Sequence, residues 1–306
     1  MSAGVSATPR KIVGLGELLW DLLPAGKQLG GAPANFAYIT NLLGDVGLVA
    51  SRLGKDELGS AATQRLSELR LSTSYVQTDA LHPTGCVQVQ VDTQGQPRFE
   101  IAKAVAWDYL EWTSAWQQLA QEADAVCFGT LAQRASTSRA TIRQFVHSMR
   151  PGAVRVFDVN LRQSFYSAEV LSDSMKLADI VKLNHDELPI IMSLFDLSHV
   201  DEQASARRLI ALHNLKLVCV TRGDGGSLLV SREGWSEHPG HEINVADTVG
   251  AGDAFTAGLL HQFLRGQTLR EMGNMANRLG AWVASSTGAT PVPQSGNLRA
   301  ELARLT

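Results

Sequence analysis

Cysteine is scarce in this sequence, and its spacing excludes several kinds of site. Among 306 residues there are three cysteines, Cys86, Cys127 and Cys219, and none forms a CxxC pair. An odd number of widely spaced cysteines argues against a disulfide framework and against a zinc site. Two of them lie in apolar runs, where buried thiols are common. We therefore expect no disulfide, as is usual for a protein of the reducing cytoplasm.

The sequence also lacks a charge excess and a long apolar run. A formal net charge of −3 offers no basic surface to nucleic acid or to an anionic membrane. No apolar run approaches the ~20 residues that a membrane helix needs. The start, MSAGVSATPR, has no apolar signal-peptide segment. We expect a cytoplasmic protein with no nucleic-acid or membrane partner.

Several nucleotide-binding and catalytic motifs are absent. The sequence contains no GxxxxGK[ST], GxSxG or HExxH motif, which excludes a P-loop enzyme. The stretch GLGELL at 14–19 has the first two glycines of a dinucleotide fingerprint, but Leu19 stands where the third glycine should be. A Rossmann oxidoreductase therefore receives little support.

What the sequence does contain is a regular alternation of short apolar runs and amphipathic stretches. Five apolar runs are typical of buried parallel strands: 11–16, 125–129, 154–160, 179–184 and 217–223. Amphipathic stretches of helical period lie between them, including 33–43, 60–70, 136–149 and 201–213. The alternation predicts right-handed βαβ units, and hence an α/β fold with a doubly wound, mostly parallel sheet flanked by helices. We expect a single domain over residues 1–306.

Residues 85–102, GCVQVQVDTQGQPRFEIA, alternate with period two instead. Valines at alternate positions share one face and TQGQP supplies a turn, so the segment predicts an antiparallel hairpin. With a second segment it could form a small β-sheet lid, built from about 17–30 and 85–105. The pattern leaves an edge extension of the main sheet equally open. The exposed edges of a lid could also pair with another copy in a homodimer.

Polar residues follow the predicted strands at their carboxyl ends, where open parallel sheets bind ligands. We expect these residues to converge on one crevice. They are Asp158, Asn160, Arg162, Asn184, Glu187, Thr221, Arg222 and Gly223.

Two of these stretches have two interpretations each. Asn184 as N-cap and Glu187 three residues on resemble a capping box, which this stretch alone favours. Alternatively, both face a hydrated Mg²⁺, which prefers oxygen ligands. The stretch TRGDGGSLL at 221–229 is either a glycine-rich turn that opens a hairpin or a polyphosphate cradle, with Thr221 and exposed amides on phosphate oxygens.

The stretch GGAPANFAYITNLLG at 30–44 places two glycines before a predicted helix. Asn35 falls in the first turn of that helix, where it contributes little to packing. A solvated helix start is the simpler interpretation of this stretch alone. The alternative is that Asn35 hydrogen bonds to a polyol.

The stretch DTVGAGDAF at 247–255 precedes another predicted helix. Gly250, Ala251 and Gly252 leave backbone amides uncovered at its start, where the helix dipole adds positive potential. Such a place suits the negative charge that develops on a transferring phosphoryl group. We expect the same potential to keep Asp253 ionised at neutral pH, so that it can accept the proton of an attacking hydroxyl.

These last two stretches resemble the N-terminal and C-terminal signatures of the ribokinase-like sugar kinases, the PfkB family, and within it the bacterial fructokinases. The resemblance runs from about Lys11 to Pro293. It implies ATP-dependent phosphorylation of a sugar hydroxyl on a ribokinase-like α/β domain with a small β-sheet lid. It also implies ATP and Mg²⁺ as cofactors, and a monovalent-cation site that many relatives use, for example for K⁺.

The resemblance further implies a role for each matching residue. Asp253 would be the catalytic base, and the amides of Gly250, Ala251 and Gly252 the anion hole. Glu187 with Asn184 matches an NxxE element that handles phosphate and, through water, Mg²⁺. The other matches form the nucleotide site, the sugar site and the monovalent-cation site: Asn184, Thr221, Gly223, Gly226 and Asn277; Asp21, Gly31, Asn35 and Arg162; Asp247, Val249 and the carbonyls around Ser286–Gly288.

Arg162 and Asp21 bear on the substrate. Fructokinases and 2-keto-3-deoxygluconate kinases carry an arginine where DVNLR has Arg162, and ribokinases tend not to. Because Asp21 would repel a sugar acid, we expect transfer of the γ-phosphoryl group of ATP to a hydroxymethyl oxygen of a neutral sugar, D-fructose. The alternatives are a 2-keto-3-deoxygluconate kinase, a ribokinase, and a catalytically silent sugar-binding regulatory protein. Trp20 is larger than its counterpart in many relatives and could narrow the sugar pocket.

Overall fold

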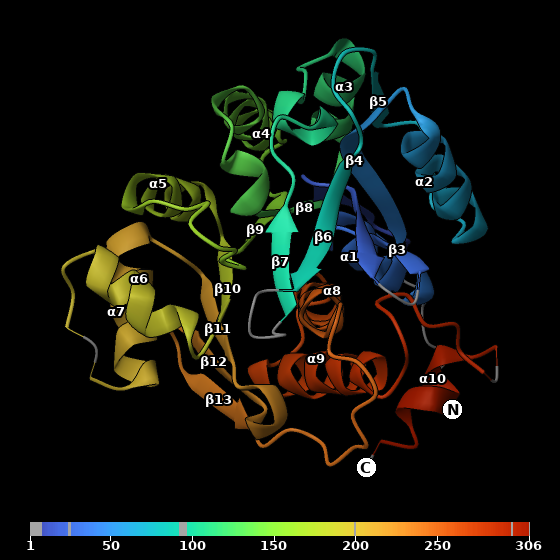
Figure 1. Ribbon diagram of the computed structural model, residues 1–306. Helices are drawn as coiled ribbons and strands as arrows, with labels where there is room; N and C mark the ends of the chain where they lie inside the picture. The colour runs from blue at the N-terminus through green and yellow to red at the C-terminus, as the bar shows by residue number, and fades with distance from the viewer. Residues whose placement is uncertain (1–7, 24–25, 92–96, 199, 295, 306) are drawn as a thin grey trace.

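The main sheet has nine strands in the order β13-β12-β11-β10-β9-β8-β1-β4-β5 (Figure 1). The computed structural model describes residues 8–23, 26–91, 97–198, 200–294 and 296–305. Only β12 runs antiparallel to its neighbours, and the other pairs are parallel. The strands are β1 (Lys11–Leu15), β4 (Val46–Gly54), β5 (Val76–Asp79), β8 (Ala125–Gly129), β9 (Val154–Asp158), β10 (Ile180–Asn184), β11 (Leu217–Thr221), β12 (Ser227–Ser231) and β13 (Trp235–His238). The five strands predicted from apolar runs are all present, and the α/β prediction is confirmed.

Helices cover both faces of this sheet because successive residues of a buried strand point to opposite sides. Val13 of β1 packs into one apolar cluster and Ile12 into the other. The first cluster includes residues of α3 (Ser114–Glu122), α4 (Ser136–Ser148), α5 (Ala168–Leu177), α6 (Glu187–Leu194) and α7 (Glu202–His213). The second includes residues of α1 (Ala32–Leu42), α2 (Glu57–Glu68), α8 (Ala251–Phe263), α9 (Leu269–Ala284) and α10 (Leu298–Leu302).

A separate small sheet has the order β3-β2-β6-β7. Its strands are β2 (Leu19–Leu23), β3 (Gly26–Gly30), β6 (Gly85–Val91) and β7 (Pro97–Ile101). β6 and β7 pair antiparallel, as the alternating pattern predicted, and the expected turn between them falls on residues 92–96, outside the described residues. Because these strands form a sheet of their own, the interpretation as an edge extension of the main sheet is wrong.

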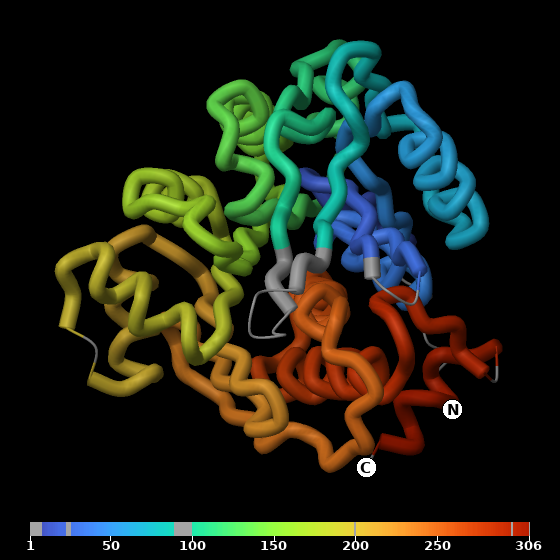
Figure 2. The backbone as a smooth tube through the Cα atoms, in the orientation of Figure 1, coloured from blue at the N-terminus to red at the C-terminus, as the bar shows by residue number. Residues whose placement is uncertain are grey.

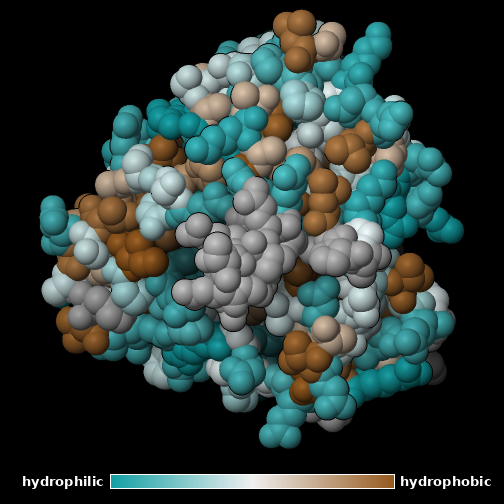
Figure 3. Space-filling model, viewed as in Figure 1, coloured by the Kyte–Doolittle hydropathy of each residue, from teal (hydrophilic) through white to brown (hydrophobic). Residues whose placement is uncertain are grey.

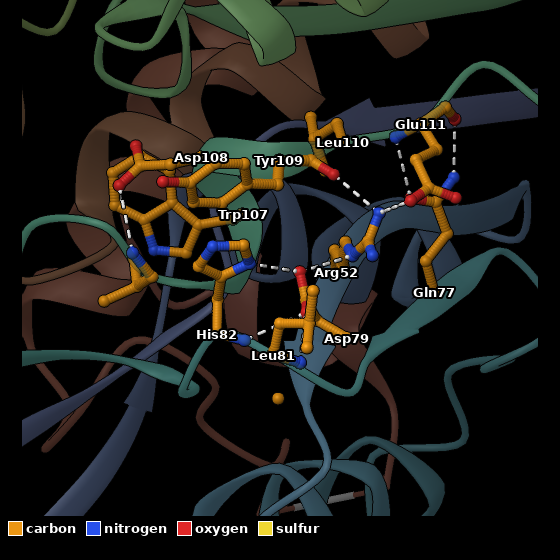
Figure 4. Close-up of polar contacts among 12 residues, drawn as sticks. Arg52, Gln77, Asp79, Leu81, His82, Trp107, Asp108, Tyr109, Leu110 and Glu111 are labelled. Carbon is orange, nitrogen blue, oxygen red and sulfur yellow. Dashed lines mark hydrogen bonds and ion pairs between the residues drawn. The ribbon is translucent and has the colours of Figure 1, made fainter.

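Polar contacts anchor the chain where it enters and leaves the β6–β7 hairpin (Figure 4). Arg52 of β4 forms ion pairs with Asp79 at 2.9 Å and with Glu111 at 2.6 Å. Asp79 also contacts His82, whose ring stacks on Tyr109 with centroids 3.5 Å apart. These contacts attach the segment before β6 and the segment after β7 to β4 of the main sheet. The two ends of the hairpin are therefore fixed relative to the main sheet.

None of the helices within the described ranges is long and apolar enough to cross a bilayer. On the face that Figure 3 shows, apolar side chains are scattered among hydrophilic ones, with one group over α6, which carries the exposed Ile190 and Leu194. All three cysteines are free, as expected, and two of them are buried.

Candidate active site

The polar residues that end neighbouring strands lie at one edge of the main sheet, as predicted. Asp158 ends β9, Asn184 ends β10 and Thr221 ends β11. In the sheet register, Asn184 lies opposite Thr221, and Lys182 lies opposite Asp158. α1 and α8 pack against each other close to this edge, although they come from opposite ends of the sequence (Figure 2). The crevice is therefore built from both halves of the chain.

The start of α8 has a glycine as N-cap and no side-chain cap, as the predicted anion hole requires. Gly250 precedes the helix with φ +79°, and a Cβ there would lie 2.5 Å from the Cβ of Ala289, so only glycine fits. No side chain caps the helix. The Ala251 amide donates to the carbonyl of Thr248 at 3.2 Å, which partly engages one of the three amides predicted to form the anion hole. The dipole of the helix still favours negative charge here.

Asp253 lies in the first turn of α8 and is partly buried. Burial raises its pKa to about 6, and the negative charge of Asp158 adds to the rise, whereas Asn35, Lys182 and Arg162 oppose it. The pKa of Asp253 therefore also depends on burial and on neighbouring charges, in addition to the helix potential that the sequence indicated. With a pKa near 6, the carboxyl group is still roughly nine-tenths ionised at pH 7.

A buried charged network lies beneath Asp253. The ammonium of Lys182 contacts both carboxylate oxygens of Asp158, at 3.1 and 3.2 Å. Thr256, one turn after Asp253 on α8, donates to Asp158 at 3.0 Å. A Cβ on Gly252 would lie 3.1 Å from the Lys182 ammonium. A positive charge thus lies directly against the backbone of the predicted anion hole.

Asn35 is not a solvated residue at a helix start. It is buried in the first turn of α1, and its Nδ2 donates to Oδ2 of Asp253 at 2.9 Å. Gly31 makes this approach of α1 possible, because its φ is +111° and a Cβ there would lie 2.5 Å from the carbonyl oxygen of Glu17. The sugar-site prediction for Asn35 is compatible with this position, since the hydrogen bond to Asp253 uses its Nδ2 and not its Oδ1.

Asp21 and Arg162 complete the predicted sugar residues. Asp21 is partly buried on β2, and a Cβ on Gly30 would lie 2.4 Å from its Oδ2. Burial raises the pKa of Asp21, and the exposed Arg162 opposes that rise. Arg162 also lowers the pKa of Asp253. The charge of one arginine therefore favours the ionised forms of both Asp21 on β2 and Asp253 on α8.

Sequence reasoning missed Glu17. It follows β1, only 5 % of it is exposed, and it lines a cavity together with Asp158 and Asp253. Burial raises its pKa to about 7, with a further contribution from Asp253. One signal was available: Glu17 is an acidic residue within the otherwise apolar GLGELL, directly after a buried strand.

Trp20 packs away from the predicted sugar residue Asp21. It is buried in the second apolar cluster, and its indole nitrogen donates to the carbonyl of Leu58 in α2 at 2.9 Å. Because neighbouring residues of a strand point to opposite faces, Trp20 faces away from the side that Asp21 occupies.

The predicted nucleotide residues lie around the β11–β12 turn. Gly223 and Gly226 have positive φ, and a Cβ on Gly226 would lie 1.9 Å from the carbonyl oxygen of His238. The turn opens an antiparallel hairpin, as one interpretation of TRGDGGSLL predicted, and this geometry is equally compatible with contacts to phosphate. Asn277 of α9 donates to Ser227 Oγ at 2.8 Å, which holds α9 against this turn.

Asn184 and Glu187 exchange the hydrogen bonds of a capping box. Asn184 Oδ1 accepts from the amide of Glu187 at 2.8 Å, and Glu187 Oε2 accepts from the amide of Asn184 at 2.8 Å. Glu187 Oε1 accepts from the amide of Leu161 at 2.7 Å, which fixes the loop that carries Arg162. Both carboxylate oxygens are engaged and the residue is buried, so it fits a contact to Mg²⁺ through water and not direct ligation.

Asp247 joins the two segments of the predicted monovalent-cation site. Its Oδ1 accepts from the amide of Val249 at 3.0 Å, and its Oδ2 accepts from the amide of Gly288 at 3.1 Å. The structure therefore brings these residues together. In the described part of the chain, no group of three or more His, Cys, Asp or Glu side chains is arranged to hold a metal ion.

Comparison with known proteins agrees with this site. The sequence pattern of the pfkB family carbohydrate kinases matches residues 24–295. The chain belongs to this family and is an ATP-dependent carbohydrate kinase.

The chain is 32% identical to a fructokinase of Salmonella typhimurium over 263 residues, which are 82% of this chain and 83% of that protein. It is also similar to the crystal structure of an uncharacterized sugar kinase from Pyrococcus horikoshii in complex with ATP, with a TM-score of 0.79, 29% identity and coverage of 96% and 100%. A fructokinase from Vibrio cholerae, in a fructose, ADP and potassium ion bound form, has the same fold, with a TM-score of 0.81, 24% identity and coverage of 97% and 99%.

Proposed function

We propose that this kinase transfers the γ-phosphoryl group of ATP to a hydroxymethyl oxygen of a neutral sugar, D-fructose. The observation that carries the proposal is the position of Asp253. It is partly buried at the uncapped start of α8 and accepts a hydrogen bond from Asn35, which comes from the opposite end of the sequence. In this proposal, the general base Asp253 lies next to the helix N-terminus that would stabilise the negative charge of the transferring phosphoryl group.

Asp253 suits the role of general base. A base works best when its pKa lies close to the working pH, because it is then ionised and still takes up a proton readily. Burial and Asp158 bring the pKa of Asp253 to about 6, well above that of an exposed aspartate. The sugar hydroxyl would lose its proton to Asp253 as its oxygen attacks the γ-phosphorus.

The charges around the site favour a neutral sugar. Glu17, Asp21 and Asp253 place three carboxyl groups there, and Arg162 acts on all three. A sugar acid would add a fourth carboxyl group near a single arginine, whereas a ketose offers hydroxyls that both carboxylates and Arg162 can hydrogen bond. The similarity to a fructokinase at 32% identity supports D-fructose among neutral sugars.

The nucleotide and ions are proposed to lie on the other predicted residues. ATP would contact Thr221, the turn at Gly223 and Gly226, and Asn184 and Asn277. Mg²⁺, reached by Glu187 through water, would supply positive charge to the phosphates when bound. A monovalent cation such as K⁺ would bind near Asp247 and Val249. The small sheet would close over the sugar as a lid, and its edges could also form a homodimer.

An ADP-release assay with ATP, Mg²⁺ and a panel of sugars tests the proposal. The panel contains fructose, ribose, tagatose, glucose and 2-keto-3-deoxygluconate. We expect the highest kcat/KM with D-fructose, and we expect Asp21→Ala to lose most of that activity. Asp173→Ala, on the surface of α5, is the matched control and should keep it. A preference for 2-keto-3-deoxygluconate that Arg162→Ala abolishes would overturn the substrate, and no ADP release with any sugar would support the regulatory alternative.

A further inference from the structure

Glu17 is a buried acidic side chain that the proposed reaction does not use. It lies in the segment between β1 and β2, and in the described part of the chain its Oε2 has no hydrogen-bond partner. Buried polar atoms almost always have a partner, and leaving one unsatisfied is costly. A ligand that hydrogen bonds to Oε2 would explain why an unsatisfied carboxylate oxygen is buried at this position.

The cavity beside Glu17 has the size of one hydroxyl group. Its volume is about 20 Å³, enough for about one water molecule or a group of that size. Asp158, Asn160 and Asp253 line it together with Glu17. The cavity therefore lies directly beside the proposed base, where a hydroxyl group of a polyol can be accommodated.

The neighbours of Glu17 indicate which part of the sugar this is. Besides burial, which has the largest effect, the charge of Asp253 raises the pKa of the Glu17 carboxyl group and the charge of Arg162 lowers it. If Asp253 takes the proton of the attacking hydroxyl, a group that touches both Glu17 and Asp253 lies close to that hydroxyl.

We propose that Glu17 is a further sugar-binding residue, whose Oε2 hydrogen bonds to a hydroxyl of the acceptor sugar close to the phosphorylated oxygen. This inference rests on the proposed function, because it takes Asp253 as the base. A carboxyl group with a pKa of about 7 can serve either way, since its acid form donates a hydrogen bond and its ionised form accepts one.

A sugar-binding role and a purely structural role for the Glu17 side chain predict different effects on the stability of the sugar-free protein. Under a structural role, substitution of the side chain would strongly lower that stability. The backbone carbonyl of Glu17 packs against Gly31, and side-chain substitutions leave that contact in place. Glu17→Met keeps the length of the side chain and removes all its hydrogen bonding, whereas Glu17→Gln keeps hydrogen bonding without charge. If Oε2 is unsatisfied until sugar binds, Glu17→Met costs the free protein only the hydrogen bonds that the backbone amides of Glu17 and Ala32 make to the carboxyl group.

The experiment measures the melting temperature of the sugar-free protein and the affinity for D-fructose by calorimetry. We expect Glu17→Met to change Tm by no more than a few degrees and to weaken fructose binding at least tenfold. Glu17→Gln should retain most of the affinity. Glu233→Met, on the exposed β12–β13 turn, is the matched control and should bind as the wild type does. Glu17→Ser, which leaves room for water, serves with the same expectation if Glu17→Met does not fold.

Unchanged sugar affinity in Glu17→Met overturns the inference, and the choice of sugar is tested separately. Unchanged fructose affinity in Glu17→Met would remove Glu17 from the sugar site, and a large fall in Tm with unchanged affinity would assign it to folding. If the wild type binds another sugar of the panel and not fructose, the proposed substrate fails and the same variants are compared with that sugar. If it binds no sugar of the panel, both proposals fail.

Discussion

Asn35 Nδ2 donates a hydrogen bond to Asp253 Oδ2 at 2.9 Å across 218 residues of sequence. The two residues lie in the first turns of α1 and α8. The bond stabilises the ionised form of Asp253 and fixes the direction of its second oxygen. If Asp253 is the base, as we propose, a carboxylate that is held in this way needs little reorganisation when the sugar binds.

Replacement of Asp253 tests its role as the base. Asp253→Asn keeps the size of the side chain but cannot accept a proton at neutral pH. We expect turnover to fall roughly 10²–10⁴-fold, the usual contribution of a positioned general base, with fructose affinity mostly retained. Steady-state kinetics and calorimetry measure the two quantities. Asp173→Asn on α5 is the matched control, and a variant of Asp253 within a few-fold of wild-type turnover would exclude it as the base.

The pH dependence of kcat/KM follows from the pKa of Asp253. Because the base must be ionised, activity should decrease as the pH falls through about 6. Asn35 lowers this pKa by its hydrogen bond, so Asn35→Ala should move the acidic limb of the profile to higher pH. A limb at the same pH in Asn35→Ala would show that another group controls it.

The Lys182–Asp158 pair should affect both rate and pH dependence. Lys182→Met removes a positive charge next to the anion hole and leaves Asp158 buried without its partner. We expect kcat to fall about 10–100-fold, less than the 10²–10³-fold typical of removing a direct oxyanion donor. The acidic limb should move to higher pH, because Asp158 raises and Lys182 lowers the pKa of Asp253.

A double variant supplies the control for Lys182. Lys182→Met with Asp158→Asn removes both charges, so no unpaired ion stays buried, and it should be more stable than Lys182→Met alone. Its acidic limb should lie at lower pH than that of Lys182→Met. If the single and double variants have the same pH profile, the pair does not set the pKa of Asp253.

The sequence predicts those elements whose signal is local. The run AVCFG is apolar throughout and forms the buried β8 as expected. β4 escaped prediction because Ser51 and Arg52 interrupt its apolar residues, and only the folded chain shows that Ser51 donates to Gly16 and that Arg52 pairs with Asp79. A strand whose polar side chains are satisfied by distant partners carries no local pattern.

The same limit applies to the site. The glycines and the carboxyl group of DTVGAGDAF indicate a helix start with an acidic first turn, and this is what the structure has. The pKa of Asp253 also depends on Asp158 and Lys182, which come from other strands and are brought close only by the fold. Glu17 is hidden for the same reason, since its burial depends on α1 and on the strands around it.

Asp45 should contribute stability without contributing to the reaction. Its side chain is fully buried and pairs with His261 and Arg265 near the end of α8, and it also accepts from the amide of Arg10. Burial favours the neutral form, but these hydrogen bonds outweigh it and hold the pKa of Asp45 well below its usual value. The ionised form therefore stabilises the fold at neutral pH, and this contribution is lost as the pH falls below about 4.

Asp45→Asn should lower the free energy of unfolding by about 2–3 kcal/mol at pH 7. A fully buried pair loses about 3–5 kcal/mol when one partner is removed, and here Arg265 and His261 keep part of their hydration. Urea unfolding at pH 7 and at low pH measures the change, and the difference between variant and wild type should shrink at low pH. A difference that is equal at both pH values would mean that packing, not charge, is responsible.

The small sheet should respond to sugar if it serves as a lid. β6 is joined to β2 in parallel register and to β7 in antiparallel register, so the hairpin can move only together with β2, which carries Asp21. Sugar that contacts Asp21 would therefore tie the whole sheet to the site and exclude water from the reaction. We expect saturating fructose to slow amide hydrogen exchange in β6 and β7.

Exchange in β13, at the far edge of the main sheet, is the internal control and should not change. Equal exchange in β6 and β7 with and without sugar, under conditions where calorimetry shows binding, would mean that the small sheet does not close.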